Sequence, residues 1–137
     1  EGVETPDRKV ELMSREQLKE MSDSGLVEVG GHTLTHPKLS QLDEAQQRHE
    51  IKANKEELET LLGKSLTSFA YPYGDHNEDT KRISKELGYD FSVATNSGPH
   101  ALHQDPYQIR RIAIFPRTDV LGLWRKIKGN YTFRKAK

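Results

Sequence analysis

Two histidines stand four residues apart in segment 29–37, which reads Val-Gly-Gly-His-Thr-Leu-Thr-His-Pro. Neutral imidazoles are common ligands of Zn²⁺ and similar ions. Pro37 disfavours a helical conformation at His36, so the pair is expected on a loop. The pattern indicates two ligands of a divalent-metal site. The alternative is that His32 only hydrogen-bonds a backbone group and His36 is an ordinary surface residue.

A second candidate is the segment Tyr71-Pro72-Tyr73-Gly74, which follows an apolar run. Proline and glycine in this order are typical of a turn. One interpretation is an ordinary turn with an aromatic side chain packed beneath it. The other is a turn that presents a backbone N–H and an aromatic wall to a ligand.

Arg110 and Arg111 are adjacent in an apolar run near residue 110. Successive strand residues point to opposite faces, so one arginine should face inward or toward the end of the strand. A buried arginine needs a carboxylate partner, and a purely structural ion pair remains open. The other four histidines are expected to be exposed: His49, His76, His100 and His103. Of these, His76 neighbours the tyrosine turn.

Composition limits what the chain can be. Its 137 residues suffice for one domain, but a mean hydropathy of −0.85 predicts a thin core or a domain of which part is missing. A formal charge of zero gives no indication of nucleic acid as a partner. Without cysteine, disulfides and thiolate metal sites are excluded. No apolar run approaches the roughly 20 residues of a membrane span.

The two ends have their own character. The sequence starts with Glu1-Gly2 and shows no signal peptide, and we expect the natural start to lie upstream. Residues 1–12 are charged and aperiodic, as in a linker or the end of an upstream element. Six lysines or arginines and no acid occur from residue 125 onward. Segment 129–137 is therefore interpreted as a solvated basic tail.

Helices and strands are expected to alternate. Capping residues predict helices that begin after Ser14, Asp43, Asn77 and Thr118 or Asp119. Short runs of strand-forming residues predict strands at 26–29, 66–71, 89–95 and 109–115. This order indicates parallel strands in an α/β fold. Because functional loops gather at the carboxyl ends of such strands, the two histidines and the tyrosine turn should open onto one face.

Taken together, the motifs are more specific than any one of them. Gly31 to Pro37, a long helix, Phe69-Ala70-Tyr71-Pro72-Tyr73-Gly74 and Gly88-Tyr89-Asp90 resemble the polysaccharide deacetylases, the NodB-homology esterases of carbohydrate esterase family four. The resemblance covers about residues 13–115. It implies a partial, distorted (β/α) barrel that lacks its first strands, with residues 13–128 forming the C-terminal two-thirds of such a domain.

The resemblance also implies a site. His32 and His36 would share a divalent metal, most often zinc, with an aspartate. Tyr71, Pro72 and Tyr73 would line the substrate groove, and the Tyr73 N–H would hold the oxyanion. Arg111, which fits better than Arg110, would orient the catalytic aspartate.

Three features depart from the family pattern. No Asp-Asp strand precedes Val29, where Asp7 and Asp23 are expected in a linker and at a helix end. Ala70 stands where the groove motif often has arginine. No Leu-x-x-His motif follows Phe115. The expected base, third ligand and general acid are therefore not found in this chain.

The expected function is metal-dependent removal of acetyl groups from an N- or O-acetylated polysaccharide, at the cell envelope or outside the cytoplasm of a bacterium. Activity is expected to need an upstream segment, so that this chain alone is inactive. The alternative is a non-catalytic module that binds carbohydrate or metal. A zincin-type peptidase ranks last, because no glutamate stands beside the first histidine. Open strand edges predict self-association or pairing with a missing N-terminal segment.

Overall fold

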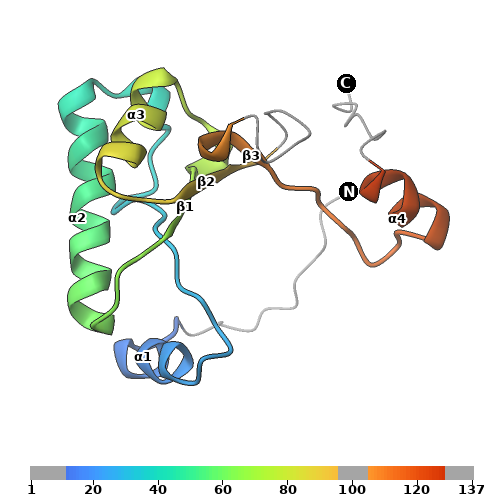
Figure 1. Ribbon diagram of the computed structural model, residues 1–137, viewed down its shortest axis with the longest axis horizontal. Coiled ribbons are helices and arrows are strands. Elements are labelled where there is room, and N and C mark those ends of the chain that lie inside the picture. Colours follow the sequence, from blue (N-terminus) through green and yellow to red (C-terminus); the bar gives the residue numbers. More distant parts are fainter. Residues whose placement is uncertain (1–11, 96–104, 129–137) are drawn as a thin grey trace.

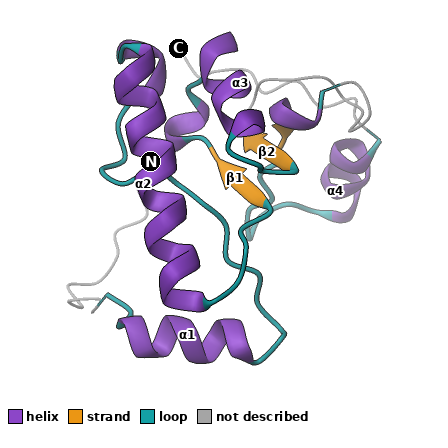
Figure 2. Cartoon of the chain, turned by 60° about the vertical axis from the view of Figure 1, so that its left-hand side comes forward, coloured by secondary structure: helices purple, strands orange, loops and turns teal. Residues whose placement is uncertain are grey.

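The structure is a computed structural model that describes residues 12–95 and 105–128. A small parallel sheet lies beside two packed helices, and a third helix lies near the C-terminal end of the longer one (Figures 1 and 2). The helices are α1 (Arg15–Asp23), α2 (Glu44–Leu62), α3 (Glu78–Glu86) and α4 (Val120–Ile127). The strands are β1 (Ser68–Ala70), β2 (Phe91–Ala94) and β3 (Ile109–Arg110). Short 3₁₀ turns occur at Leu39–Gln41, Pro72–Gly74 and Pro106–Gln108.

The predicted helix caps are confirmed. Ser14, Asp43 and Asn77 each accept a hydrogen bond from the backbone N–H three residues on, and in all three the reciprocal bond completes a capping box. Asp119 caps α4 through the Gly122 N–H. Each such cap stabilises its helix by about 1 kcal/mol. Gly63 ends α2 in the left-handed conformation, with φ of 65°.

The sheet has the strand order β1-β2-β3, and both strand pairs are parallel, as predicted. Phe69, Ser92 and Ala94 are buried, and in register Phe69 pairs with Ser92. The alternate residues Phe91 and Val93 are only half-buried. One face of the sheet is therefore covered more completely than the other.

Of the four predicted strands, one is absent and three are shorter than expected. Residues 26–29 do not form a strand: Leu26 is 90% exposed, and pairing begins only at Gly31, which bridges Phe69. The strand predicted at 109–115 is reduced to Ile109–Arg110, which pair with Val93 and Ala94 at the end of β2. The strands predicted at 66–71 and 89–95 are present but shorter, as β1 and β2.

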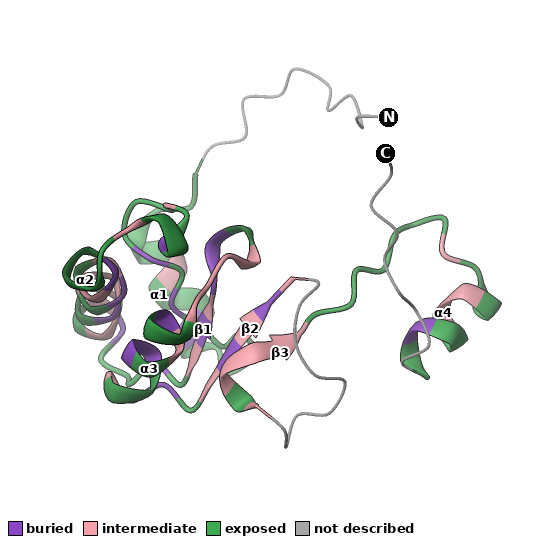
Figure 3. Ribbon diagram, turned by 90° about the horizontal axis from the view of Figure 1, so that it is seen from above, coloured by how far each residue is buried: buried purple, intermediate pink, exposed green. Residues whose placement is uncertain are grey.

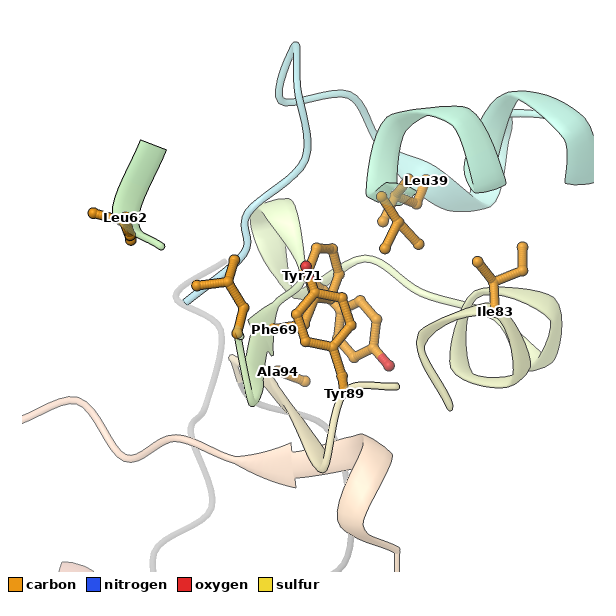
Figure 4. Packing of buried hydrophobic residues seen from close by; sticks show 9 residues of the cluster. Leu39, Leu62, Phe69, Tyr71, Ile83, Tyr89 and Ala94 are labelled. Atoms are coloured by element: carbon orange, nitrogen blue, oxygen red, sulfur yellow. The ribbon is translucent and has the colours of Figure 1, made fainter. Parts of the chain in front are cut away.

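The core lies between α2, α3 and the sheet, and three aromatic rings meet at its centre (Figure 4). Phe69 lies edge-on to Tyr71 and tilted against Tyr89, with ring centroids 5.3 Å apart in both pairs. From α2, Ile51 is fully buried and the Lys55 ammonium lies 4.8 Å from the centroid of the Tyr89 ring. The core is small and holds the two loops that follow Gly31 and β1.

The segment after β3 differs from the rest. α4 lies apart from α1, α2 and α3, and its surface is mostly exposed (Figure 3). Val120 is 85% exposed and Ile127 is 72% exposed, and several other large apolar side chains of residues 112–127 are also exposed: Ile112, Ile114, Phe115, Leu121 and Trp124. Among the described residues, no helix combines the length and the apolar character needed to cross a membrane.

Candidate metal-binding and active site

The loop of residues 32–37, hereafter the His loop, starts directly beside the sheet. The Gly31 N–H donates to Ser68 O at 2.9 Å, and the Ala70 N–H donates to Gly31 O at 2.8 Å. A Cβ on Gly31 would collide with the Tyr89 hydroxyl, and one on Gly30 would lie 2.6 Å from the Ser68 Oγ. The two glycines are therefore needed for close packing against Ser68 and Tyr89.

The His32 side chain is held in place by a hydrogen bond from its ring to the backbone. Its Nδ1 lies 2.6 Å from the carbonyl oxygen of Ala70, which can only accept, so Nδ1 carries the proton. Its backbone N–H donates to Asn54 Oδ1 at 3.0 Å. The neutral ring consequently has its lone pair on Nε2. A metal-binding histidine typically has one ring nitrogen fixed in this way by a backbone carbonyl.

His36 completes the pair. The His loop is not helical, as Pro37 predicted, and His36 has a φ of 60°. Its ring centroid lies 4.8 Å from that of His32, with the planes at 69°. Two imidazoles bound to one tetrahedral Zn²⁺ at about 2.0–2.1 Å would place their centroids roughly 5 Å apart. The two side chains present therefore fit a shared ion.

A third ligand is not found close by. Within residues 12–95 and 105–128, no three His, Asp or Glu side chains come together as a metal site. Asp23 forms ion pairs with Lys19 and Lys64, both at 3.1 Å, on α1 and the loop after α2. Asp7 lies outside the described residues. In the described part of the chain the site thus consists of two imidazoles.

The tyrosine turn, residues 71–74, lies against the His loop. The Tyr73 ring is 61% exposed and contacts the His36 ring edge-on, at 4.7 Å between centroids. Tyr71 is buried, and its hydroxyl donates to Tyr107 O at 2.8 Å. Burial raises the pKa of the Tyr71 hydroxyl above its ordinary value. The prediction that the two loops share one face is confirmed.

The backbone of this turn leaves one donor available. The N–H groups of Tyr71, Gly74 and Asp75 all have backbone acceptors within the fold. The Tyr73 N–H has none among the described residues. Gly74, with φ of 69°, packs so closely on Thr95 that a Cβ would collide with it. The Thr95 hydroxyl in turn donates to Tyr73 O at 3.3 Å.

Left-handed backbone concentrates at the site. Among the described residues, the non-glycine positions with positive φ are Thr33, His36 and Tyr73, and all three belong to the two loops. Such a conformation costs an L-residue about 1–2 kcal/mol. Within the loop, the His36 N–H donates to Thr33 Oγ1 at 3.1 Å. Strain of this kind persists only where the surroundings enforce it, and it often marks a functional site.

Two residues of α2 contact the His loop and were missed by the sequence reasoning. Glu50 accepts hydrogen bonds from Leu34 and Thr35, and Asn54 accepts one from His32. Burial tends to raise the pKa of Glu50, but these hydrogen bonds outweigh it and hold the pKa below its ordinary value. Their spacing of four on a helix places both on one face, but nothing local indicates that this face meets the histidines.

The remaining predicted residues have mixed outcomes. His49 is exposed, as expected, whereas His76 is half-buried because its ring stacks on Tyr71 at 4.8 Å. His100 and His103 lie outside the described residues. Arg110 is half-buried, and Arg111 is exposed at the end of β3. The Arg111 backbone N–H donates to Ala94 O at 3.1 Å.

A hollow of about 510 Å³ borders the His loop. Thr35 and Pro37 form one side, and Leu42, His49 and Glu50 belong to the other. It opens to solvent, and neither His32 nor His36 is among the residues that line it. Both histidines are themselves exposed at the surface.

Comparison with known proteins assigns this arrangement to a family. The polysaccharide deacetylase profile matches residues 5–92. YxkH of Bacillus subtilis, whose name places it among the polysaccharide deacetylases, is 30% identical over 104 residues, covering 76% of this chain and 37% of that protein. A poly-β-1,6-N-acetyl-D-glucosamine N-deacetylase of Staphylococcus aureus is 32% identical over 113 residues, covering 77% and 39%.

A solved structure agrees with this assignment. The Streptococcus pyogenes deacetylase PplD, in complex with acetate, superposes with a TM-score of 0.75 at 30% identity, over 85% of this chain and 51% of that one. The chain thus spans about two-fifths of the two curated relatives and half of this structure. The fold is a partial form of the deacetylase fold. The paired imidazoles and the tyrosine turn beside them therefore belong to a member of the polysaccharide deacetylase family.

Proposed function

We propose that this chain carries part of a metal-dependent active site that removes acetyl groups from an N- or O-acetylated polysaccharide. One observation carries the proposal: the imidazoles of His32 and His36 converge, and the Ala70 carbonyl holds Nδ1 of His32 so that Nε2 can bind a metal. The metal is most simply zinc, which neutral imidazoles bind well. The names of the relatives support acetylated polysaccharide as the substrate class.

The residues around the pair have distinct tasks in this proposal. When bound, a divalent metal polarises a carbonyl and lowers the pKa of water to about 7. The Tyr73 N–H, which has no partner among the described residues, donates to the oxygen on which negative charge develops. Tyr71, Pro72 and Tyr73 form the wall of the substrate groove, with the exposed Tyr73 ring beside His36. Arg111 orients the catalytic aspartate.

The third ligand, the base and the general acid are proposed to come from outside this chain. The described residues supply no third ligand, and the chain covers less than half of its curated relatives. Activity therefore requires an upstream segment, and the chain by itself is inactive. By family, the enzyme acts outside the cytoplasm or at the bacterial cell envelope, where substrates of this class occur.

The direct test is acetate release from an acetylated oligosaccharide by the full-length gene product. Wild type is compared with His32→Ala, and with His49→Ala as a control for the loss of an exposed imidazole. Loss of activity in His32→Ala alone supports the proposal. Equal activity in all three proteins contradicts it.

A second candidate is a module that binds carbohydrate or metal without turnover. The lack of a third ligand in the described part of the chain favours it. Zinc or oligosaccharide binding by the full-length product, without acetate release, would distinguish this function from the first.

We also propose that α4 and residues 112–115 form a contact surface for the missing N-terminal segment of the domain or, in its absence, for a second copy of this chain. Side chains of this surface are apolar and exposed, including Ile114, Phe115 and Trp124. Residues 112–115 follow β3 and pair with no strand among the described residues. Exposed strand edges and apolar patches favour association.

A further inference from the structure

The His loop adopts a conformation that needs external support. Thr33 and His36 both have positive φ, at 65° and 60°. Residues 32–37 belong to no helix or strand. The single hydrogen bond within the loop joins the His36 N–H to the Thr33 hydroxyl oxygen. Leu34 and Thr35 lie between Thr33 and His36. The position of the His36 ring therefore depends on the contacts that hold these two residues.

Those two residues are held by one carboxylate. The Leu34 and Thr35 N–H groups donate to Glu50 Oε2 at 3.0 and 2.9 Å, and the Thr35 hydroxyl donates to Glu50 Oε1 at 2.7 Å. Both oxygens of the carboxylate are thus used, and all three donors come from adjacent residues. Hydrogen bonds to an ionised acceptor are roughly twice as strong as neutral ones.

The helix that presents Glu50 is itself well fixed. Its buried Gln47 accepts from the Thr80 hydroxyl at 2.8 Å, which ties α2 to α3. Ile51 is fully buried in the core. Asn54, one turn after Glu50, accepts from the His32 N–H at 3.0 Å. The same face of α2 therefore holds the loop at its first residue and at its centre.

We propose that Glu50 is a positioning residue for the metal site: its carboxylate holds the His loop in the conformation that brings the imidazoles of His32 and His36 together. This inference rests on the metal site proposed above. It assigns no contact with the metal or the substrate to Glu50, which acts only through residues 34 and 35.

Glu50→Gln is the sharpest variant, because it keeps the shape of the side chain but replaces one acceptor oxygen by an NH₂ group. That group would face an N–H or O–H donor. Glu56→Gln is the matched control, since Glu56 lies on the same helix in an exposed ion pair with Lys52 at 3.6 Å. Thr35→Val removes only the hydroxyl donor and provides a second, milder variant if Glu50→Gln gives no cooperative melt.

Two readouts are needed. Amide hydrogen exchange at Leu34 and Thr35, measured on the metal-free 137-residue chain, should accelerate by about tenfold or more in Glu50→Gln and less in Thr35→Val. Zn²⁺ affinity of the full-length gene product, measured by competition with a chromophoric chelator, should fall by about 10- to 100-fold in Glu50→Gln. Both quantities should stay unchanged in Glu56→Gln.

The outcomes separate the two proposals. Faster exchange in Glu50→Gln, combined with no zinc binding by the wild-type full-length gene product, would confirm that Glu50 holds the loop and would overturn the metal site. Unchanged exchange at Leu34 and Thr35, with zinc affinity intact in a folded Glu50→Gln protein, would overturn the role of Glu50 and leave the metal site standing. Where Glu50→Gln does not fold, the same two results in Thr35→Val decide.

Discussion

The Nδ1 atom of His32 lies 2.6 Å from the carbonyl oxygen of Ala70, so the end of β1 determines which nitrogen of this imidazole can bind a metal. Ala70 also donates its own N–H to Gly31, the residue before the histidine. One residue of the sheet thus fixes both the start of the His loop and the tautomer of its first ring. The arrangement of the two imidazoles therefore depends on the sheet as much as on the loop.

Loss of either imidazole should weaken zinc binding far more than loss of an exposed histidine. We expect His32→Ala and His36→Ala to lower Zn²⁺ affinity by more than about 100-fold. This loss exceeds the one typical of a residue that only hydrogen-bonds to a metal ligand. His49→Ala should have no effect, since His49 is an exposed residue of α2. Chelator competition at neutral pH measures all three. Equal affinities would argue against a shared ion.

The contact between Gly31 and Tyr89 predicts a specific pattern of stability. Gly31→Ala should lower the free energy of unfolding by about 1–3 kcal/mol, because its Cβ would collide with the Tyr89 hydroxyl. Tyr89→Phe should be nearly neutral, since the hydroxyl is buried and has no hydrogen-bond partner among the described residues. The double variant should recover part of the loss. Urea denaturation tests the set, and additive effects would refute the contact.

Backbone conformation at Tyr73 can be tested by side-chain replacement. Tyr73→Asn and Tyr73→Val both remove the ring beside His36, but asparagine tolerates the left-handed φ of 58° and valine does not. The valine variant should be less stable than the asparagine variant by about 1–2 kcal/mol. Thermal or urea melts provide the comparison. If valine were tolerated equally well, the left-handed conformation would be in doubt.

Asp105 should stabilise the fold at neutral pH and lose this effect in acid. Burial tends to raise its pKa, but hydrogen bonds from Lys81 and the Tyr107 N–H lower it below the ordinary value of 3.8. A carboxyl with a lower pKa in the folded state stabilises it above the unfolded pKa, and this contribution disappears as the pH falls through the folded value.

The variant to compare is Asp105→Asn. It should be less stable than wild type at pH 7 by about 1 kcal/mol, since the 2.8 Å ion pair with Lys81 is only partly shielded from solvent. The difference should shrink as the pH is lowered below the ordinary carboxyl range. Urea melts at a series of pH values measure it. A constant difference would show that ionisation of Asp105 is not its cause.

The exposed surface of α4 predicts association. Light scattering of the 137-residue chain should give a mass above that of a monomer, and Trp124→Ser should reduce it, because the Trp124 side chain is 54% exposed. Arg125→Ser, at a neighbouring exposed position, provides the control. A monomer with a cooperative melt in the wild-type chain would contradict this prediction.

Local sequence patterns predicted the parts of the fold that are local in cause. The caps at Ser14, Asp43 and Asn77 were predictable because each is formed by residues three apart. The strand expected at 26–29 was wrong because a strand also needs a neighbour, and the chain reaches β1 only at Gly31. Strand-forming residues alone do not provide that information.

In the candidate site, too, features with a local cause were predictable and features that depend on distant residues were not. The spacing of His32 and His36, with Pro37, predicted a loop that carries two convergent imidazoles, and the rings do lie 4.8 Å apart. The support from Glu50 was not predictable, because its partners lie 15 and 16 residues away along the chain. The left-handed backbone of Tyr73 was equally hidden, since tyrosine has no preference for that conformation.

The three hydrogen bonds between Glu50 and residues 34 and 35 have a consequence for how this sequence can diverge. Only one of them uses a side chain of the loop, the Thr35 hydroxyl, and the other two use backbone N–H groups that every residue except proline carries. Among homologues, position 50 should therefore tolerate little change and position 35 should keep a hydroxyl side chain, whereas position 34, which uses only its backbone, should vary freely except to proline. Substitutions at positions 34 and 50 should show weak covariation despite their direct contact.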